Sequence, residues 1–70
     1  MDEAGNHAWH EIGLMWFYKG SLDDSAEFYA RAGDVYESIE DYGNAVICYI
    51  PAYTLDPIDL FADKAIGAFI

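Results

Sequence analysis

Small and aromatic residues recur at helical intervals over residues 26–57, and this pattern limits the possible folds more than any other feature of the chain. With Ala26 as the first position, they occupy positions 4, 7, 8, 11, 20, 24, 27 and 32: Tyr29, Ala32, Gly33, Tyr36, Ala45, Tyr49, Ala52 and Pro57. Small side chains let two antiparallel helices approach closely, and aromatic rings fill the space beside them. The pattern therefore predicts a tightly packed helical hairpin.

This spacing resembles the tetratricopeptide repeat, whose first helix carries an aromatic residue, Leu, Gly and Tyr, and whose second carries Ala, Phe and Ala before a Pro. The match is best over 26–57 and partial over 6–39 and 60–70. The upstream signature consists of Trp9, Ile12, Gly13 and Trp16, and the downstream one of Ile66 and Gly67, which follow Ala32 and Gly33 by 34 residues, the period of the family. The resemblance implies helical hairpins.

The upstream and central signatures overlap, because Gly13 and Gly33 are only 20 residues apart. The segment from about Ser25 to Ile39 must then serve as the second helix of one hairpin and the first helix of the next. The Gly33 position is expected at a close crossing with the third helix near Ala45.

Length and composition indicate one all-α domain spanning residues 1–70, with residues 1–5 as a flexible arm. Seventy residues are near the lower limit for a self-supporting core, but 54% of them are hydrophobic and 17% aromatic. Three to four antiparallel helices are expected, at about 6–18, 23–38 and 42–55, with a fourth from Pro57 onward.

Local signals set the expected helix ends. Gly20 should break the chain after the first helix, and Ser21 or Asp23 should cap the second. Asp41 should cap the third helix. Pro51 should kink that helix or end it near residues 48–50, and Pro57 should take the first position of the fourth helix.

Charge restricts the possible partners. Thirteen acidic residues against three basic ones give a net charge of -10, which excludes the basic surface of a protein that binds nucleic acid or anionic membranes directly. The longest apolar stretch, 45–53, is too short to span a membrane and contains Pro51. A single Cys48 and the lack of a signal-peptide pattern favour a cytoplasmic protein.

Catalytic and metal-binding patterns are weak. His7, His10 and Glu11 lie within one helical turn, but they do not form the His-Glu-x-x-His pattern and have no third strong ligand nearby. Cys48 lies in an apolar stripe, where a buried small side chain is expected rather than a nucleophile. We therefore expect no enzyme activity, no metal site and no cofactor.

The acidic residues are concentrated, with seven of the thirteen between Asp23 and Asp41 and Arg31 as the only base among them. The predicted partner-binding residues are four acids that should form a solvent-facing strip and two aromatic residues of the first helix: Glu27, Asp34, Glu37, Asp41, Trp16 and Phe17. The resemblance implies that a peptide groove would be lined by His7, His10, Leu14, Phe17, Tyr18, Glu27, Ala30, Asp34, Glu37 and Ser38. The Lys, Arg and Asn groups that clamp a terminal carboxylate in the family are absent there.

Two functions compete. The first is a non-enzymatic interaction module that binds a basic or amphipathic protein segment through an acidic, aromatic-rich face. The second is a small acidic inhibitor of viral counter-defence type, which would mimic DNA and block a nuclease or another nucleic-acid-binding protein. Helical turns rise about 5 Å each, so carboxylates on successive turns are comparable in spacing with phosphates. The first function is preferred.

Self-association is also expected, because the aromatic residues exceed what one small core can hide. The sequence predicts a dimer or larger homo-oligomer through the first or fourth helix, with Trp16, Phe17 or Phe69 at the contact.

Overall fold

The computed structural model describes the backbone of residues 3–69 and the side chains of residues 7–68. The described part of the chain forms four helices: α1 (Glu3–Asp23), α2 (Ala26–Ser38), α3 (Tyr42–Leu55) and α4 (Asp59–Phe69). The prediction of a small all-α domain with helical hairpins is confirmed. Residues 3–5 are the first residues described in α1, and residues 1 and 2 lie outside the described part, so a flexible arm over 1–5 stays a prediction.

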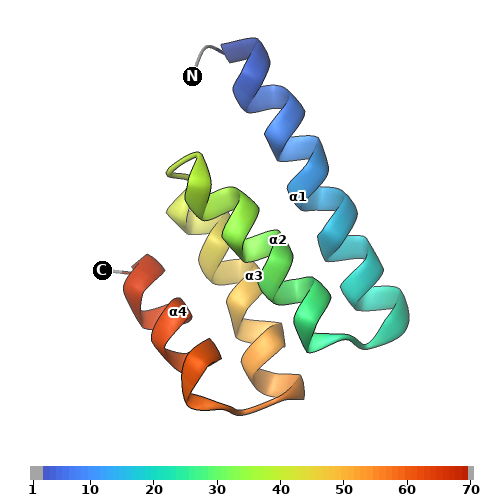
Figure 1. Ribbon diagram of the computed structural model, residues 1–70, viewed down its shortest axis with the longest axis vertical. Helices are drawn as coiled ribbons and strands as arrows, with labels where there is room; N and C mark the ends of the chain where they lie inside the picture. Colours follow the sequence, from blue (N-terminus) through green and yellow to red (C-terminus); the bar gives the residue numbers. More distant parts are fainter. Residues whose placement is uncertain (1–2, 70) are drawn as a thin grey trace.

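Each helix packs mainly on the next one in the chain, so the helices form a thin, up-and-down layer (Figure 1). The Cα atoms extend over 35 × 28 × 13 Å. One helix is about 4.6 Å across at its Cα atoms, so the shortest dimension corresponds to about two helices in depth. In the view of Figure 1, α2 passes in front of α3, and α1 and α4 lie at the two edges. Such a layer has two broad faces and a small interior.

The interior is built from small residues and tyrosines. The larger cluster of buried side chains comprises Ala32, Tyr36, Ala45, Cys48, Tyr49 and Ala68, and the smaller one Ala30, Ala52 and Phe61. Ala32, Ala45 and Ala52, three small positions of the predicted hairpin, are fully buried. Their size allows α2 and α3 to approach closely, as the spacing predicted.

Three glycines make room for tyrosine rings of the following helix. A Cβ built on Gly13 would lie 2.9 Å from the Tyr36 ring, and one on Gly20 would lie 2.9 Å from the Tyr29 ring. A Cβ on Gly33 would overlap the ring of Tyr49. The close approach of Gly33 to the third helix is thus confirmed, with the Tyr49 ring filling the position rather than Ala45.

Gly20 does not break the first helix, contrary to expectation, because it serves helix packing instead of a turn. The helix continues to Asp23, and the chain reverses at Asp24, which has a left-handed φ of 50°. The Ser25 amide donates to the Gly20 carbonyl at 3.1 Å, and the Ser25 hydroxyl caps α2 by accepting from the Phe28 amide at 3.3 Å. The cap is therefore Ser25, not Ser21 or Asp23.

The end of α2, like the end of α1, has a residue with a left-handed φ followed by an amide that bonds back to the helix. Glu40 has a φ of 60°, and the Asp41 amide donates to the Tyr36 carbonyl at 2.9 Å. This six-to-one bond with a left-handed residue before it is a Schellman motif, which glycine usually completes. Both left-handed positions, Asp24 and Glu40, carry side chains here, so the sequence gives no glycine signal for either helix end.

Prolines act differently from the prediction. Pro51 does not end α3, which is continuous from Tyr42 to Leu55, and Asp41 caps it as expected. Packing of α3 on its neighbours holds both halves of the helix despite the missing amide of Pro51. Pro57 lies two residues before α4, whose first turn begins with the Phe61 and Ala62 amides donating to the Ile58 carbonyl.

We expect Gly33→Leu to destabilise the fold by about 1 to 3 kcal/mol or more, because the Tyr49 ring occupies the space that the new side chain needs. Thermal unfolding followed by circular dichroism measures the change. Gly43→Ala is the matched control, since a Cβ there meets no described atom within 4 Å, and it should leave stability unchanged or raise it by up to about 1 kcal/mol. An unaltered midpoint for Gly33→Leu would rule out the tetratricopeptide-like register.

Glu40→Gly should stabilise the protein by up to about 1 kcal/mol, because glycine adopts the left-handed conformation of this position without the penalty that a Cβ brings. Ser38→Gly, two residues earlier but inside α2, should instead destabilise by about 0.5 to 1 kcal/mol. Urea unfolding of the two variants tests the opposite signs. Destabilisation by both would show that residue 40 is not strained.

Candidate functional site

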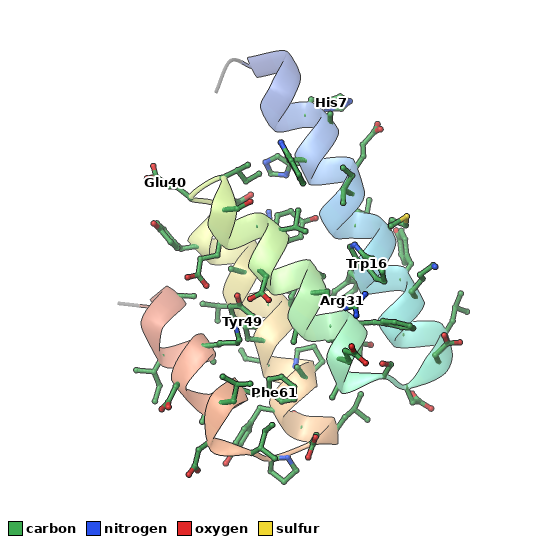
Figure 2. All side chains as sticks on the ribbon, in the orientation of Figure 1. His7, Trp16, Arg31, Glu40, Tyr49 and Phe61 are labelled. Carbon is green, nitrogen blue, oxygen red and sulfur yellow. The ribbon has the colours of Figure 1, made fainter. Side chains whose placement is uncertain are left out.

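The acidic residues of α2 hold α3 and α4 in place. The Tyr49 side chain is fully buried at its ring, and its hydroxyl lies 2.6 Å from Asp34 Oδ1 and 2.8 Å from Glu37 Oε2. Lys64 Nζ of α4 donates to the same Asp34 oxygen at 2.8 Å. Figure 2 shows Tyr49 between α2 and α4. The Tyr49 hydroxyl has one proton and can donate to only one of the two carboxylates at a time. Because Lys64 and Tyr49 share the Asp34 oxygen, the cluster links α2, α3 and α4 through hydrogen bonds.

The electrostatics of this cluster favour the neutral tyrosine. Burial raises the pKa of Tyr49 well above its ordinary value, and the hydrogen bonds to Asp34 and Glu37 raise it further. Lys64 also lies over the ring, 5.7 Å from its centre. The phenol is therefore a hydrogen-bond donor at neutral pH, and it connects α3 to the carboxylates of α2.

The other two acids of the predicted strip also make contacts within the chain. Arg31 Nη2 donates to Glu27 Oε1 at 2.8 Å. Asp41 accepts from both nitrogens of Asn44, and His10 Nε2 lies 3.3 Å from Asp41 Oδ2. Glu27, Asp34 and Glu37 are exposed, whereas Asp41 is partly buried. The structure brings the four acids onto or beside α2, but each is engaged locally.

Trp16 and Phe17 face α2 and are half-buried. The Trp16 ring centre is 5.4 Å from that of Phe28, with Lys19 and Arg31 over the ring at 5.3 and 5.1 Å (Figure 2). The Phe17 ring lies 5.3 Å from Tyr29 in an edge-to-face arrangement. Both predicted binding aromatics thus contribute to the contact between α1 and α2. Phe69 lies outside the residues whose side chains are described.

The groove implied by the family resemblance is only partly open. Ala30 is buried against Ala52 and Phe61, so it separates the exposed residues on either side of it. Leu14 instead lies near Ile47 and Cys48 of α3, beside a small hollow of about 90 Å³. The ten implied residues therefore do not line one continuous groove.

Neither the histidines nor the cysteine forms a reactive arrangement. His7 Nε2 pairs with Glu11 at 3.3 Å, and among the described residues no group of three His, Cys, Asp or Glu side chains gathers as metal ligands would. The Cys48 side chain is 1% exposed. Burial, with a smaller contribution from Asp41, raises the pKa of its thiol to about 12, which suppresses the nucleophilic thiolate.

An apolar surface on α3 was missed by the sequence analysis, which considered only the side of this helix that faces α2. The outer stripe of α3 consists of Ile47, Ile50 and Thr54, and the two isoleucines are 57% and 54% exposed. The helix contains no charged residue from Tyr42 to Leu55. A helix that is apolar all round was the available signal, because it predicts burial on more than one side.

Two open grooves run beside the outer stripe of α3. One, of about 340 Å³, lies between α2 and α3 and is lined by Asp24, Tyr29, Ile50, Pro51, Thr54 and Leu55. The other, of about 350 Å³, lies between α3 and α4 and is lined by Ile50, Tyr53, Thr54, Ala62, Ala65 and Ile66. Because Ile50 and Thr54 belong to both, the grooves form one apolar surface.

Searches of protein-family models, curated proteins and solved structures found no match to the chain. No helix within the described residues has the length and apolar character needed to cross a membrane.

Alkaline pH should destabilise the fold. The unfolded Cys48 thiol loses its proton near its ordinary pKa of 9.0, whereas the native thiol keeps it until about 12, so the free energy of unfolding falls as the pH rises through this range. Tyr49 adds to the loss above its ordinary pKa of 10.0, because its native pKa is raised as well. Urea midpoints measured between pH 8 and the alkaline limit test this window.

Cys48→Ala separates the two contributions. It removes the thiol titration and should flatten the decline between pH 9.0 and 10.0, whatever the stability of the variant at neutral pH. Tyr49→Phe removes the hydroxyl hydrogen bonds and should lower stability at every pH, but it should change the pH dependence only above pH 10.0. Identical slopes for Cys48→Ala and the parent would mean that the native thiol titrates normally.

Proposed function

We propose that this protein is a non-enzymatic interaction module that binds an amphipathic protein segment with a basic flank. The observation that carries the proposal is the uncharged α3, whose outer stripe leaves Ile47 and Ile50 more than half exposed. An apolar side chain exposed alone is common, but a continuous apolar surface beside grooves is typical of protein-binding sites.

The two broad faces of the layer differ in chemistry. The open side of α2 carries charged residues on successive turns, Glu27, Arg31 and Asp34, whereas the outer stripe of α3 carries none. Burying the α3 stripe in an interface removes apolar surface from water without desolvating a charge. The α3 side is therefore the favoured docking surface.

The rim of the α3 surface indicates which partner fits it. Asp24 lines the groove between α2 and α3 and forms no ion pair with any described residue. The net charge of -10 attracts basic segments over longer distances. An amphipathic helix with apolar side chains in the two grooves and a Lys or Arg beside Asp24 satisfies both features.

The acidic strip is assigned a supporting role in this proposal. Glu27, Asp34, Glu37 and Asp41 steer a basic partner through their charge, while Trp16 and Phe17 support the helix packing behind them. Removing all four charges would also remove the Tyr49 and cap contacts, so single acids at the rim are better probes. On its cysteine usage, the module is assigned to the cytoplasm.

The alternative function is charge mimicry of a nucleic acid, and it rests on the net charge. Arg31 lies between Glu27 and Asp34 along α2 and pairs with Glu27, which interrupts the row of negative charge. Self-association of the module through α1 or α4 is a separate part of the proposal, because it uses surfaces other than the α3 grooves.

A short helical peptide of Leu and Lys with one apolar and one basic side is a suitable probe of the α3 surface. We expect Ile47→Ser/Ile50→Ser to weaken its binding about tenfold or more, because much of the buried apolar area is lost. The loss should persist at about 1 M salt, where the Debye length falls to about 3 Å. Fluorescence anisotropy of the labelled peptide gives the dissociation constants.

Two neighbouring acids provide a matched charge control. Asp24→Asn should weaken binding at low salt more than Asp23→Asn does, because only Asp24 lines the groove, although the two changes alter the net charge equally. If the isoleucine variant binds like the parent, and all binding disappears at high salt, the interaction is electrostatic. That result would reject the α3 surface and favour charge mimicry.

A further inference from the structure

Gly67 of α4, like Gly43 near the start of α3, receives no tyrosine ring from a described residue. Gly13, Gly20 and Gly33 each accept a tyrosine ring of the next helix in the chain. A Cβ built on Gly67 meets no described atom within 4 Å. Glycine inside a helix costs about 0.5 to 1 kcal/mol relative to alanine, and the described residues give no reason for that cost at this position.

The position of Gly67 in α4 leaves it at the open edge of the layer. Phe61 and Ala68 are the buried residues of α4 and pack towards the interior. Leu60, Asp63 and Gly67, which are spaced as i, i+3 and i+7, share an exposed side of the helix. Gly67 also follows Gly33 by 34 residues, and Gly33 receives Tyr49 from the following helix α3.

The opposite edge of the layer offers a tyrosine. Met15, Tyr18 and Leu22 have the same i, i+3 and i+7 spacing on α1, and all three are exposed, Tyr18 by 58%. They line an open groove of about 520 Å³ together with Glu11, Leu14 and Lys19. Each three-residue stripe is about 10 Å long, so the two edges match in length.

One pair of opposite charges can form between the two edges. Arg31 pairs with Glu27 and Lys64 with Asp34, whereas Lys19 forms no ion pair with a described carboxylate. Asp59 and Asp63 at the α4 edge form no ion pair with the described cations. Lys19 can therefore pair with Asp63 or Asp59 across the contact, although Asp23, one turn after Lys19, likewise forms no ion pair with a described cation.

We propose that copies of this chain associate head to tail, with α1 of one copy packed on α4 of the next, Tyr18 over Gly67 and Lys19 beside Asp63. The proposal specifies, and rests on, the self-association proposed above. In the layer α1 runs opposite to α4, so the next copy continues the up-and-down order of the helices (Figure 1). The contact joins two different surfaces and therefore repeats along a growing array.

Two complementary variants test this contact. Tyr18→Ser removes the ring at the α1 edge, and Gly67→Leu fills the α4 edge of its own copy. Each variant alone should be a monomer, with self-association weakened about tenfold or more relative to the parent. An equimolar mixture should form a heterodimer and nothing larger, because the intact α1 edge of the Gly67→Leu copy meets the intact α4 edge of the Tyr18→Ser copy.

Sedimentation velocity at about 0.15 M salt, where the Debye length of about 8 Å limits repulsion between the acidic copies, measures these states. The parent should show concentration-dependent species larger than a dimer. Gly43→Leu is the matched control, because this glycine is also open but lies in α3, and it should assemble like the parent. Circular dichroism checks that every variant keeps its helices.

Three results would overturn the contact. They are a parent that stays monomeric at high concentration, a Gly67→Leu variant that assembles like the parent, or a mixture that gives no heterodimer. Binding of the Leu–Lys peptide is measured on the same monomeric variants, since their α3 grooves are unchanged. Retained peptide binding with failed assembly would reject the head-to-tail contact alone, whereas lost peptide binding would count against the interaction module itself.

Discussion

The fold depends on tyrosine rings seated on glycines of the preceding helix. Gly13, Gly20 and Gly33 lack the Cβ that would collide with Tyr36, Tyr29 and Tyr49, so each ring fills the gap between two helix backbones. This contact gives a chain of 70 residues large buried rings together with short distances between helices. It also acts only between neighbours, which explains why the helices spread into a layer instead of closing around one core.

The same tyrosines explain how an acidic chain with three basic residues remains folded. The Tyr49 ring is buried on Gly33, and its hydroxyl emerges beside Asp34 and Glu37, where Lys64 neutralises part of the charge. Asp34 and Glu37 therefore stabilise the packing of the helices in addition to carrying surface charge. Their engagement leaves α2 as a charged but internally bonded side of the layer and leaves the uncharged α3 as the side with unused apolar surface.

A thin layer has consequences for function. Among the described residues, large apolar side chains remain exposed on α1, α3 and α4, because each of these helices lacks a neighbour on at least one side. We propose the α3 surface as the binding site for an amphipathic partner and the two edges as the surfaces of self-association. These uses are compatible, since an array built through α1 and α4 would present one α3 surface per copy.

The amino-acid sequence alone predicts the all-α class, the central hairpin and its small buried positions, because the spacing of Ala32, Gly33, Ala45 and Ala52 reflects local helix geometry. It also determined the Asp41 cap. It did not determine the end of α1 or the passage of α3 through Pro51, because left-handed Asp24 carries no glycine signal and tertiary packing overrides proline. The residues that pair with the acids also could not be predicted from the sequence. Lys64 is 30 residues from Asp34 and His10 is 31 from Asp41, and only the packing of distant helices brings such side chains together. The exposed face of α3 likewise depends on the tertiary structure, because the sequence of a helix that is apolar all round does not show which side packs against other helices.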